Sequence, residues 1–437
     1  MLNKLTRPLS RLVEQYLPDP FVFVTLLTLF VMAMAIMFTP ATPIETMQFW
    51  GQGLWNLLTF AMQMLLVLIA GFMLANTKLC AKLLNTLATL AKTPAQAIIL
   101  VTLVSMLASW LNWGFGLVVG ALFAKALAKK IMVDYRVLVA SAYSGFIVWH
   151  GGLAGSVPLT IASAGHFAES QIGILSTSET IFSYFNLILL AVMLIVLPLL
   201  NRAMLPPKNE QVLVDKKNLQ EPPTATPSQT LTPAEKLENS AILGILIGLL
   251  GCGYLTHYFV VQGGGLNLNI IIALFLFLAI LLHGSAANIL HSLQQAIKGG
   301  AGIVIQFPFY AGIMAIMVNT GLAEQISAGF VSISNAQTLP FWSFLSAGLV
   351  NIFVPSGGGQ WAVQAPIVIP AAQALDADIA RVAMAVAWGD AWTNLIQPFW
   401  ALPVLAIAGL KARDIMGFCL LQLIVTGIII AAVLSFV

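Results

Sequence analysis

The stretch "NIFVPSGGGQW", residues 351–361, interrupts a long apolar segment with a proline, a serine and three consecutive glycines. Glycine and proline are both unfavourable in the interior of a helix. Asn351 and Gln360 place amide side chains on either side of the interruption. The stretch therefore predicts a point inside an apolar region where one helix ends and the next begins, with bare backbone between them.

The chain around this stretch has the composition of a membrane protein. Of its 437 residues, 59% are hydrophobic and 8% are charged, whereas soluble domains carry roughly 25% charged residues. Apolar segments recur along the chain at about the 20 residues that a spanning helix needs, without the alternating pattern of membrane barrels. We expect an all-α polytopic membrane protein with about 9–11 transmembrane segments.

Charge and cysteine content exclude several other classes. The net charge of +3 is spread over loops and indicates no nucleic-acid partner. Cys80, Cys252 and Cys419 have neither disulfide nor metal-ligand spacing. No G-x-x-x-x-G-K-[ST] motif occurs, so an ATP-driven pump is disfavoured, and no cofactor is expected.

Lysine and arginine positions orient the predicted spans. The apolar runs lie near 21–39, 57–75, 96–128 (two segments), 137–164, 180–200, 239–260, 267–283, 301–318, 341–373 (two segments), 382–410 and 416–436. With a cytoplasmic N-terminus, every one of the 19 Lys and Arg residues except Arg381 falls on the cytoplasmic side, as the positive-inside rule requires. Lys4, Arg7 and Arg11 precede a first apolar run that is too long for a signal peptide, so we expect a retained helix there.

A polar, proline-rich stretch, residues 201–238, divides the chain into membrane regions 1–200 and 239–437. Its composition predicts a flexible cytoplasmic linker. The two regions repeat one another, because a shift of 243 positions carries Gln63 onto Gln306 and "QMLLVLIAGFMLANT" onto "QFPFYAGIMAIMVNT" without a gap. An odd number of crossings separates the copies, so we expect an inverted repeat, which is typical of secondary transporters.

The alignment of the two halves continues beyond these spans. Amphipathic segments that begin at Leu79 and Leu322 coincide under the same shift, and we expect each to lie at a membrane interface. The shift also carries Trp149 onto Trp392. A shift of 239 carries Asn112 onto Asn351, so the opening stretch has a counterpart in "NWGFG", residues 112–116.

Both interrupted stretches lie in apolar units of about 33 residues, which is long for one span and short for two. A re-entrant hairpin with its tip at mid-membrane fits this length, and an ordinary tight loop between short spans is the alternative. Each half also has a second interruption, "VWHGGLAGSVP" at 148–158 and "WGDAWTNLIQPFWALP" at 388–403. We expect two broken helices there, and all four breaks should converge, offering free N–H and C=O groups to a ligand.

The predicted core contains no Lys or Arg, so an anion would meet backbone N–H groups and neutral side chains. The candidate substrate-binding residues are Asn112, Gly114, Gly116, His150, Gly151, Asn351, Ser356, Gly357, Gly358, Gly359, Gln360, Asn394 and Gln397. Six aromatic residues are candidates for the wall of a small apolar cavity, with ordinary packing as the alternative: Trp113, Phe115, Trp149, Trp361, Trp392 and Phe399.

Two titratable residues fall within the predicted core. Asp390 is its only acid, and an intramembrane acid is a functional candidate by default. Asp390 is the candidate coupling-ion residue, for a proton or for a Na⁺ ion near it, and a structural hydrogen bond is the alternative. His150 is its only histidine, with hydrogen bonding to a carboxylate, titration or packing as its possible roles.

Several motifs carry a family resemblance, namely "LPDPFVF", "NWGFGLVVGALFA", "QFPFYAGI", "FVPSGGGQWAVQAPIVIPAAQAL", "QPFWALPVLAIAGL" and "RDIMG". The chain resembles the bacterial short-chain fatty acid transporter family and, more remotely, the ion transporter superfamily. The resemblance implies uptake of acetoacetate and butyrate-like acids across the bacterial inner (cytoplasmic) membrane. It also implies a homodimer that works as an elevator with two hairpins.

Together these features predict a secondary active transporter rather than an enzyme. Its partners would be a small monocarboxylate, a symported H⁺ or Na⁺, and the lipid bilayer. Two other classes stay open at this point. An intramembrane hydrolase would recruit Ser356 as nucleophile and His150 as base, and an anion channel would show conductance in place of saturable, ion-coupled uptake.

Overall fold

The computed structural model describes residues 20–214, 219, 232–352 and 354–437, and their regular structure is entirely helical. Eight helical segments of this described part are long and apolar enough to cross a membrane: Phe21–Phe38, Leu58–Ala75, Pro94–Leu111, Tyr135–Ile161, Tyr184–Ala203, Pro233–Val260, Ala286–Asn319 and Ala412–Phe436. Four shorter apolar helices accompany them. The prediction of an all-α, multi-pass membrane protein is confirmed. Lys4, Arg7, Arg11 and linker residues 215–218 and 220–231 lie outside the described residues.

The first half of the chain begins with two helices that precede the repeated unit. They are α2 (Pro20–Phe38) and α3 (Pro43–Gly53). The repeated unit comprises α4 (Leu58–Ala75), α5 (Lys78–Leu87), α6 (Pro94–Leu111), α7 (Trp113–Ala128), α8 (Tyr135–Ser144), η1 (Gly145–Gly151), α9 (Ser156–Ile161), α10 (Glu169–Ile172) and α11 (Tyr184–Ala203). A short turn of helix, η2 (Lys208–Glu210), follows it.

The second half repeats this order. It begins with α12 (Pro233–Asn239), α13 (Ala241–Val260), α14 (Leu268–His283), α15 (Ala286–Ala296) and η4 (Ile297–Gly300). The unit then follows as α16 (Ala301–Asn319), α17 (Leu322–Ile333), α18 (Leu339–Val350), α19 (Gly357–Ala374), α20 (Ile379–Asn394), α21 (Pro398–Ala408) and α22 (Ala412–Phe436). Each unit is a long helix, an amphipathic helix, a helical hairpin, a broken helix and a final long helix.

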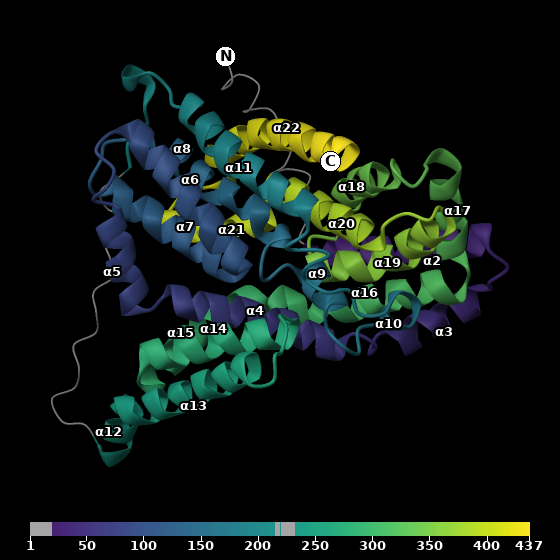
Figure 1. Ribbon diagram of the computed structural model, residues 1–437, viewed down its shortest axis with the longest axis horizontal. Helices are drawn as coiled ribbons and strands as arrows, with labels where there is room; N and C mark the ends of the chain where they lie inside the picture. The colour runs from purple at the N-terminus through teal and green to yellow at the C-terminus, as the bar shows by residue number, and fades with distance from the viewer. Residues whose placement is uncertain (1–19, 215–218, 220–231, 353) are drawn as a thin grey trace.

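The equivalent elements of the two units lie at opposite ends of the molecule. Figure 1 shows α5 at the end that carries α12, whereas α17 lies at the other end, where it contacts α2. Both are the amphipathic helices that the sequence places at membrane interfaces. Their separation along the long axis is what two antiparallel copies require.

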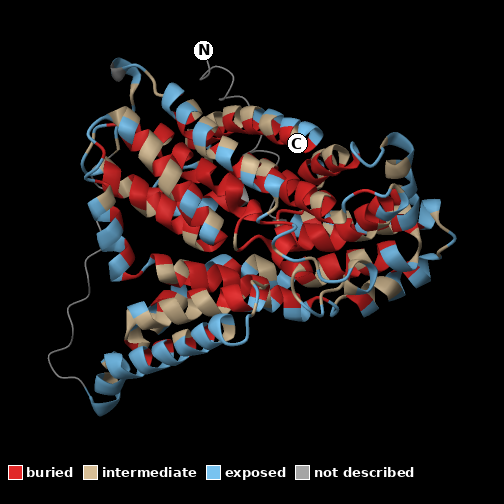
Figure 2. Ribbon diagram, viewed as in Figure 1, coloured by how far each residue is buried: buried red, intermediate tan, exposed pale blue. Residues whose placement is uncertain are grey.

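Burial separates peripheral from central helices. Only 22% of the apolar window is buried inside the protein in α2, and the same fraction in the segment ending with α13, whereas 94% is buried in residues 135–161. Figure 2 shows α13 as a mostly exposed helix and the interrupted helices as a buried centre. Exposed leucines such as Leu246, Leu249 and Leu250 give α13 a lipid-facing surface.

Each hairpin is broken at a capped residue. Asn112 ends α6 and begins α7 at one extended position, with φ −159° and ψ 129°, and its side chain accepts a hydrogen bond from the Phe115 N–H. Ser356 begins α19 in the same way, with φ −156°, and accepts from the Gly359 N–H. Such caps stabilise a helix start by about 1 kcal/mol. The two breaks read from the sequence at 112–116 and near 355–359 are therefore present.

The two broken helices are also where the sequence places them. In the first, α8 tightens into the 3₁₀ helix η1 and stops at Gly151, and α9 restarts at Ser156. In the second, α20 ends at Asn394 and α21 begins after the extended residue Gln397, which precedes a proline. The second half-helix of each pair, α9 or α21, therefore begins in the interior of the protein.

Arg381, the exception to the charge pattern, is held by the second half. Its guanidinium donates a 2.8 Å hydrogen bond to the Leu434 carbonyl near the end of α22 and lies over the Phe185 ring at 5.5 Å. The basic group therefore satisfies a carbonyl at a helix C-terminus, a favourable place for a positive charge.

Candidate functional site

The four interruptions converge on the Trp149 side chain of η1. Its ring centroid lies 6.0 Å from that of Trp113 in the first hairpin tip and 6.1 Å from that of Trp400 at the start of α21. Gly357, at the tip of the second hairpin, lies so close that a Cβ there would meet the Trp149 ring at 2.8 Å. Trp149 itself belongs to the first broken helix, so all four breaks meet around one side chain.

His150 is fully buried beside this meeting point, and its ring is hydrogen-bonded to the first turn of α9, where the broken helix begins again. Its ring stacks on Trp149 at 3.9 Å, and its Nε2 accepts a 3.2 Å hydrogen bond from the Val157 N–H of α9. Because Nε2 accepts, the proton of the neutral ring is on Nδ1. That atom lies 3.6 Å from Oδ2 of Asp390, so the two titratable residues that the sequence singles out face each other.

Asp390 is a buried acid without the usual partners. Neither carboxylate oxygen receives a hydrogen bond from a described residue, and its polar neighbours are the His150 ring and the Asn394 side chain. Asp134, the other acid that is buried among the described residues, caps α8 and forms a 2.8 Å ion pair with Arg136. A buried carboxyl group that lacks such compensation is costly, so Asp390 stays a candidate functional residue.

Asn351 ties the second hairpin to the second broken helix. Its amide nitrogen donates to the Asp390 carbonyl at 2.8 Å, to Thr393 Oγ1 at 2.9 Å and to Asn394 Oδ1 at 2.7 Å. The Gln397 amide in turn donates to the Asn351 carbonyl. The hairpin tip and the break at 394–397 are thereby fixed to one another.

The glycine run of the second tip lies against three aromatic rings. A Cβ at Gly357 would collide with His150, one at Gly358 would meet Phe60 at 2.6 Å, and one at Gly359 would meet Tyr310 at 2.5 Å. Only glycine allows this approach. Ser356 caps the Gly359 N–H, so the earlier N–H groups of an 18-residue helix point into the junction with its positive dipole end.

Buried polar atoms without a partner gather around the second tip and the second break. Within the described part of the chain, no hydrogen bond is made by the following side-chain atoms: Asn351 Oδ1, Gln360 Oε1, both Asp390 oxygens, Gln397 Oε1, Asn394 Nδ2, His150 Nδ1 and Trp149 Nε1. Buried polar groups are nearly always paired in folded proteins. This cluster is therefore the candidate ligand site among the described residues.

The first tip is different, because its polar side chain is already used. Asn112 donates from Nδ2 to the Val67 carbonyl at 3.3 Å while its Oδ1 caps α7. Gly114 lies against the Leu68 backbone of α4, and Gly116 against Ser109 across the hairpin. These residues hold the tip to α4 and close the hairpin.

Gly151 and the neighbouring Trp388 form a second link between the breaks. Asn186 donates to the Gly151 carbonyl at 3.0 Å and accepts from Trp388 Nε1 at 2.9 Å. Tyr143 adds a 2.5 Å hydrogen bond to the Asn394 carbonyl. Sequence reasoning missed Asn186 and Tyr143, although both are polar residues inside predicted spans, which is the signal that could have found them.

The six candidate aromatic residues do not gather around one place, and several of them serve packing, the alternative that the sequence left open. Trp113 and Trp149 do pack together, and Trp400, which was not predicted, completes their cluster. Trp361 and Trp392 lie in two other apolar clusters, and Phe115 packs on Phe275 of α14. The side chain of Phe399 lies outside the described part. Repeat symmetry placed Trp392 opposite Trp149, but it turns away and donates its N–H to the Leu423 carbonyl at 2.7 Å.

Comparison with known proteins identifies relatives along the whole chain. The family described as "Short chain fatty acid transporter" matches residues 1–437. A protein of Escherichia coli (strain K12) named "Putative short-chain fatty acid transporter" is 43% identical over 432 residues, which is 98% of each chain. A protein of the same name from Haemophilus influenzae is 43% identical over 437 residues, again 98% of each chain.

Two solved structures share the fold at 15% identity. The YdaH transporter of Alcanivorax borkumensis superimposes with a TM-score of 0.60 over 96% of this chain and 97% of its own. MtrF of Neisseria gonorrhoeae, from a class of antimetabolite efflux pumps, gives a TM-score of 0.50 over 98% and 97%. The relatives are transporters, so the protein is a transporter and not an enzyme. The chain belongs to the short-chain fatty acid transporter family.

Proposed function

We propose that this transporter carries small monocarboxylates, such as butyrate or acetoacetate, by cation-coupled secondary transport through the junction around Trp149. The observation that carries the proposal is the cluster of buried, unpartnered polar atoms where four helix interruptions meet. The junction contains donors for a carboxylate and acceptors for a cation, but no Lys or Arg. The rings of Trp113, Trp149 and Trp400 offer an apolar surface to a short acyl chain.

The carboxylate is held at the second hairpin tip. The N–H groups of Gly357 and Gly358 begin α19, where a helix dipole favours an anion. His150 Nδ1 and Asn394 Nδ2 are further buried donors without a partner in the described structure. Ser356 and Gly359 complete the tip, and Gly151 with the first tip (Asn112, Gly114 and Gly116) supplies the opposite wall.

The coupling cation, H⁺ or Na⁺, binds on the acceptor side of the junction. Asp390 supplies two oxygens, and Asn351 Oδ1, Gln360 Oε1 and Gln397 Oε1 are further buried acceptors that receive no hydrogen bond from described residues. Oxygen atoms of this kind are ligands that a hard cation prefers. An adjacent cation also lowers the cost of an anion at the tip, because opposite charges attract strongly in an apolar interior.

The transport movement in this proposal is based on the inverted repeat. Regions 1–200 and 239–437 form two antiparallel copies joined by the cytoplasmic linker 201–238, with the N-terminus in the cytoplasm and both hairpins re-entrant from opposite sides. The hairpins and broken helices move together as an elevator against a scaffold built on α4 and α16. The protein works in the bacterial inner membrane as a homodimer.

Uptake of labelled butyrate and acetoacetate by proteoliposomes tests the proposal. We expect saturable accumulation driven by an imposed inward Na⁺ or H⁺ gradient, with Asp390→Asn abolishing accumulation. Unchanged uptake in the combined variants of Asn351, Ser356 and Asp390 would contradict the site. Planar-bilayer currents that do not saturate would favour the anion channel. The hydrolase alternative is set aside, because Ser356 caps α19 and His150 Nε2 is bonded to Val157.

A further inference from the structure

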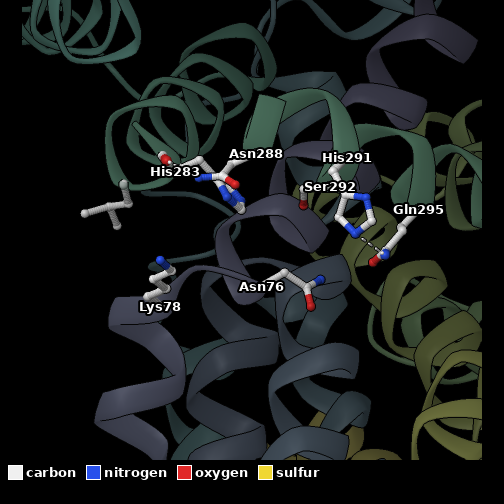
Figure 3. A pocket seen from close by; sticks show the side chains of 8 residues that line it. Asn76, Lys78, His283, Asn288, His291, Ser292 and Gln295 are labelled. Atoms are coloured by element: carbon white, nitrogen blue, oxygen red, sulfur yellow. Dashed lines mark hydrogen bonds between the residues drawn. The ribbon is translucent and has the colours of Figure 1, made fainter. Parts of the chain in front are cut away.

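A polar cavity of about 300 Å³ lies away from the transport junction. Figure 3 shows its side chains, which come from the connection between α4 and α5, the end of α14, and α15. It therefore lies between the repeated unit of the first half and the helices that introduce the second half. Nothing in the proposed transport cycle uses this cavity.

The lining carries positive charge and no acid. Lys78 is exposed at the first position of α5, and within the described residues no carboxylate lies within ion-pair distance of it. His283 and His291 lie on the opposite side of the cavity (Figure 3). Two helices, α5 and α15, begin beside it, and their N-terminal N–H groups favour an anion.

A buried hydroxyl independently indicates that a ligand belongs there. Ser292 lines the cavity, is 3% exposed, and its Oγ has no hydrogen-bond partner among the described residues. Asn288 and Gln295 also line the cavity; the Asn288 amide donates to the His283 carbonyl at 3.2 Å and the Gln295 amide lies 2.9 Å from His291 Nε2, and each NH₂ has a second hydrogen for a ligand. Nearly all buried hydroxyls in proteins are paired, so Ser292 is ready to donate to an oxygen-rich ligand.

The cavity lies at a membrane interface. The charge pattern places the end of α4, the end of α14 and Lys78 on the cytoplasmic side. Leu282 lines the cavity, and Leu79 and Leu83 of α5 are more than half exposed beside it. A group bound here would thus have its charged end among Lys78 and Ser292 and apolar surface next to it.

We propose that this cavity binds a phosphate group, either the headgroup of an anionic phospholipid of the cytoplasmic leaflet or a free phosphate ion. A phosphate offers three or four acceptor oxygens, and it matches an ammonium group, a serine hydroxyl, amide N–H groups and two helix N-termini. Its binding joins α5 to α15 and so links the two halves of the chain at one interface.

Native mass spectrometry of the full-length protein tests the lipid arm. The protein is reconstituted into nanodiscs that contain phosphatidylglycerol and phosphatidylcholine and is released from them in the mass spectrometer. The amount of each lipid that stays bound is compared for four proteins: wild type, Lys78→Gln, Ser292→Val and the control Lys82→Gln. Lys82 is one turn along α5, exposed, and outside the cavity lining. We expect selective retention of phosphatidylglycerol, about fivefold weaker in Lys78→Gln and Ser292→Val and unchanged in Lys82→Gln.

Calorimetric titration with inorganic phosphate separates the second source. Phosphate binding that Lys78→Gln and Ser292→Val weaken, without selective lipid retention, would assign the cavity to a free anion and support the site. Equal retention of phosphatidylglycerol by all four proteins, together with no phosphate binding, would overturn the proposal. Thermal unfolding of each variant confirms that it is folded, and Ser292→Val keeps the shape of the side chain.

Discussion

The two hairpin tips are equivalent by sequence but not by chemistry. At the first tip, Asn112 uses both ends of its amide to cap α7 and to bind α4. At the second tip, the two N–H groups of the Asn351 amide are shared among three acceptors of the neighbouring broken helix, and its oxygen has no donor from the described residues. The acid Asp390 also lies on the second side only. The two hairpin tips therefore have similar backbones, but the polar groups of the first are hydrogen-bonded within the protein, whereas the second keeps buried polar atoms without a partner in the described structure.

The two tips therefore contribute differently to stability and to transport. A tip whose polar groups are satisfied within the protein contributes stability and shape. A tip that leaves buried groups unpaired lowers stability unless a ligand compensates. We therefore expect substitutions at the first tip to change stability more than transport, and substitutions at the second tip to change transport more than stability.

The largest expected effect is at Asp390. Asp390→Asn removes a carboxyl group that can carry a proton or bind a cation while it preserves shape, so accumulation of labelled butyrate should fall to the level of protein-free liposomes. Stability should be unchanged or higher, because the buried carboxyl group lacks a compensating partner. Thermal unfolding and uptake are measured on the same preparations.

A matched control exists on the same helix. Asp378 caps α20 at an exposed position by accepting from the Arg381 N–H at 3.1 Å, and asparagine caps a helix equally well. Asp378→Asn should retain uptake. If both variants lose accumulation, or if neither does, Asp390 has no special role in coupling.

The two asparagines provide the next comparison. Asn351→Ala should reduce the ratio of the maximal uptake rate to KM at least tenfold, because the tip loses its hydrogen bonds to the break at residues 393–394. Asn112→Ala should lower stability by about 1 kcal/mol through loss of a helix cap, with little change in KM. Proteoliposome kinetics and thermal unfolding distinguish the two. Equal losses of transport at both positions would remove the distinction between the tips.

Two glycines sharpen the same contrast. A Cβ at Gly116 would meet the backbone of Ser109, so Gly116→Ala forces the two helices of the first hairpin apart and should cost roughly 1–3 kcal/mol of stability. A Cβ at Gly358 would meet side-chain atoms alone, those of the Phe60 ring at 2.6 Å and of the Phe307 ring at 3.4 Å, and side chains shift more readily than backbone. Gly358→Ala should therefore be milder in thermal unfolding but should raise KM for butyrate. The reverse order of stability loss would argue against this packing.

The smallest expected effect is at His150. His150→Gln keeps an acceptor for the Val157 N–H but loses the donor that faces Asp390, so KM should rise roughly two- to tenfold, the range of one hydrogen bond. Uptake should continue, because Asp390 remains. Complete loss of accumulation would transfer the coupling role to His150.

Much of this architecture could be predicted from the sequence because backbone breaks and repeats are local signals. The Pro-Ser-Gly-Gly-Gly run predicts the second break, and the alignment of Asn112 with Asn351 predicts the first. The contact between His150 and Asp390 could not be predicted, since the expected convergence of the four breaks does not say which side chains meet. Tryptophans serve packing and ligand binding alike, so the sequence could not decide between a wall and packing, and only the structure shows Trp400 beside Trp149 where the repeat suggested Trp392.

The most direct test of the central claim is a cryo-electron microscopy map of the purified protein with saturating butyrate and Na⁺ at neutral pH. The account predicts ligand density next to the N–H groups of Gly357 and Gly358, with its carboxylate toward His150 and Asn394. Density that contacts the first tip without reaching Gly357 and Gly358, or density at a site remote from all four helix interruptions, would contradict it.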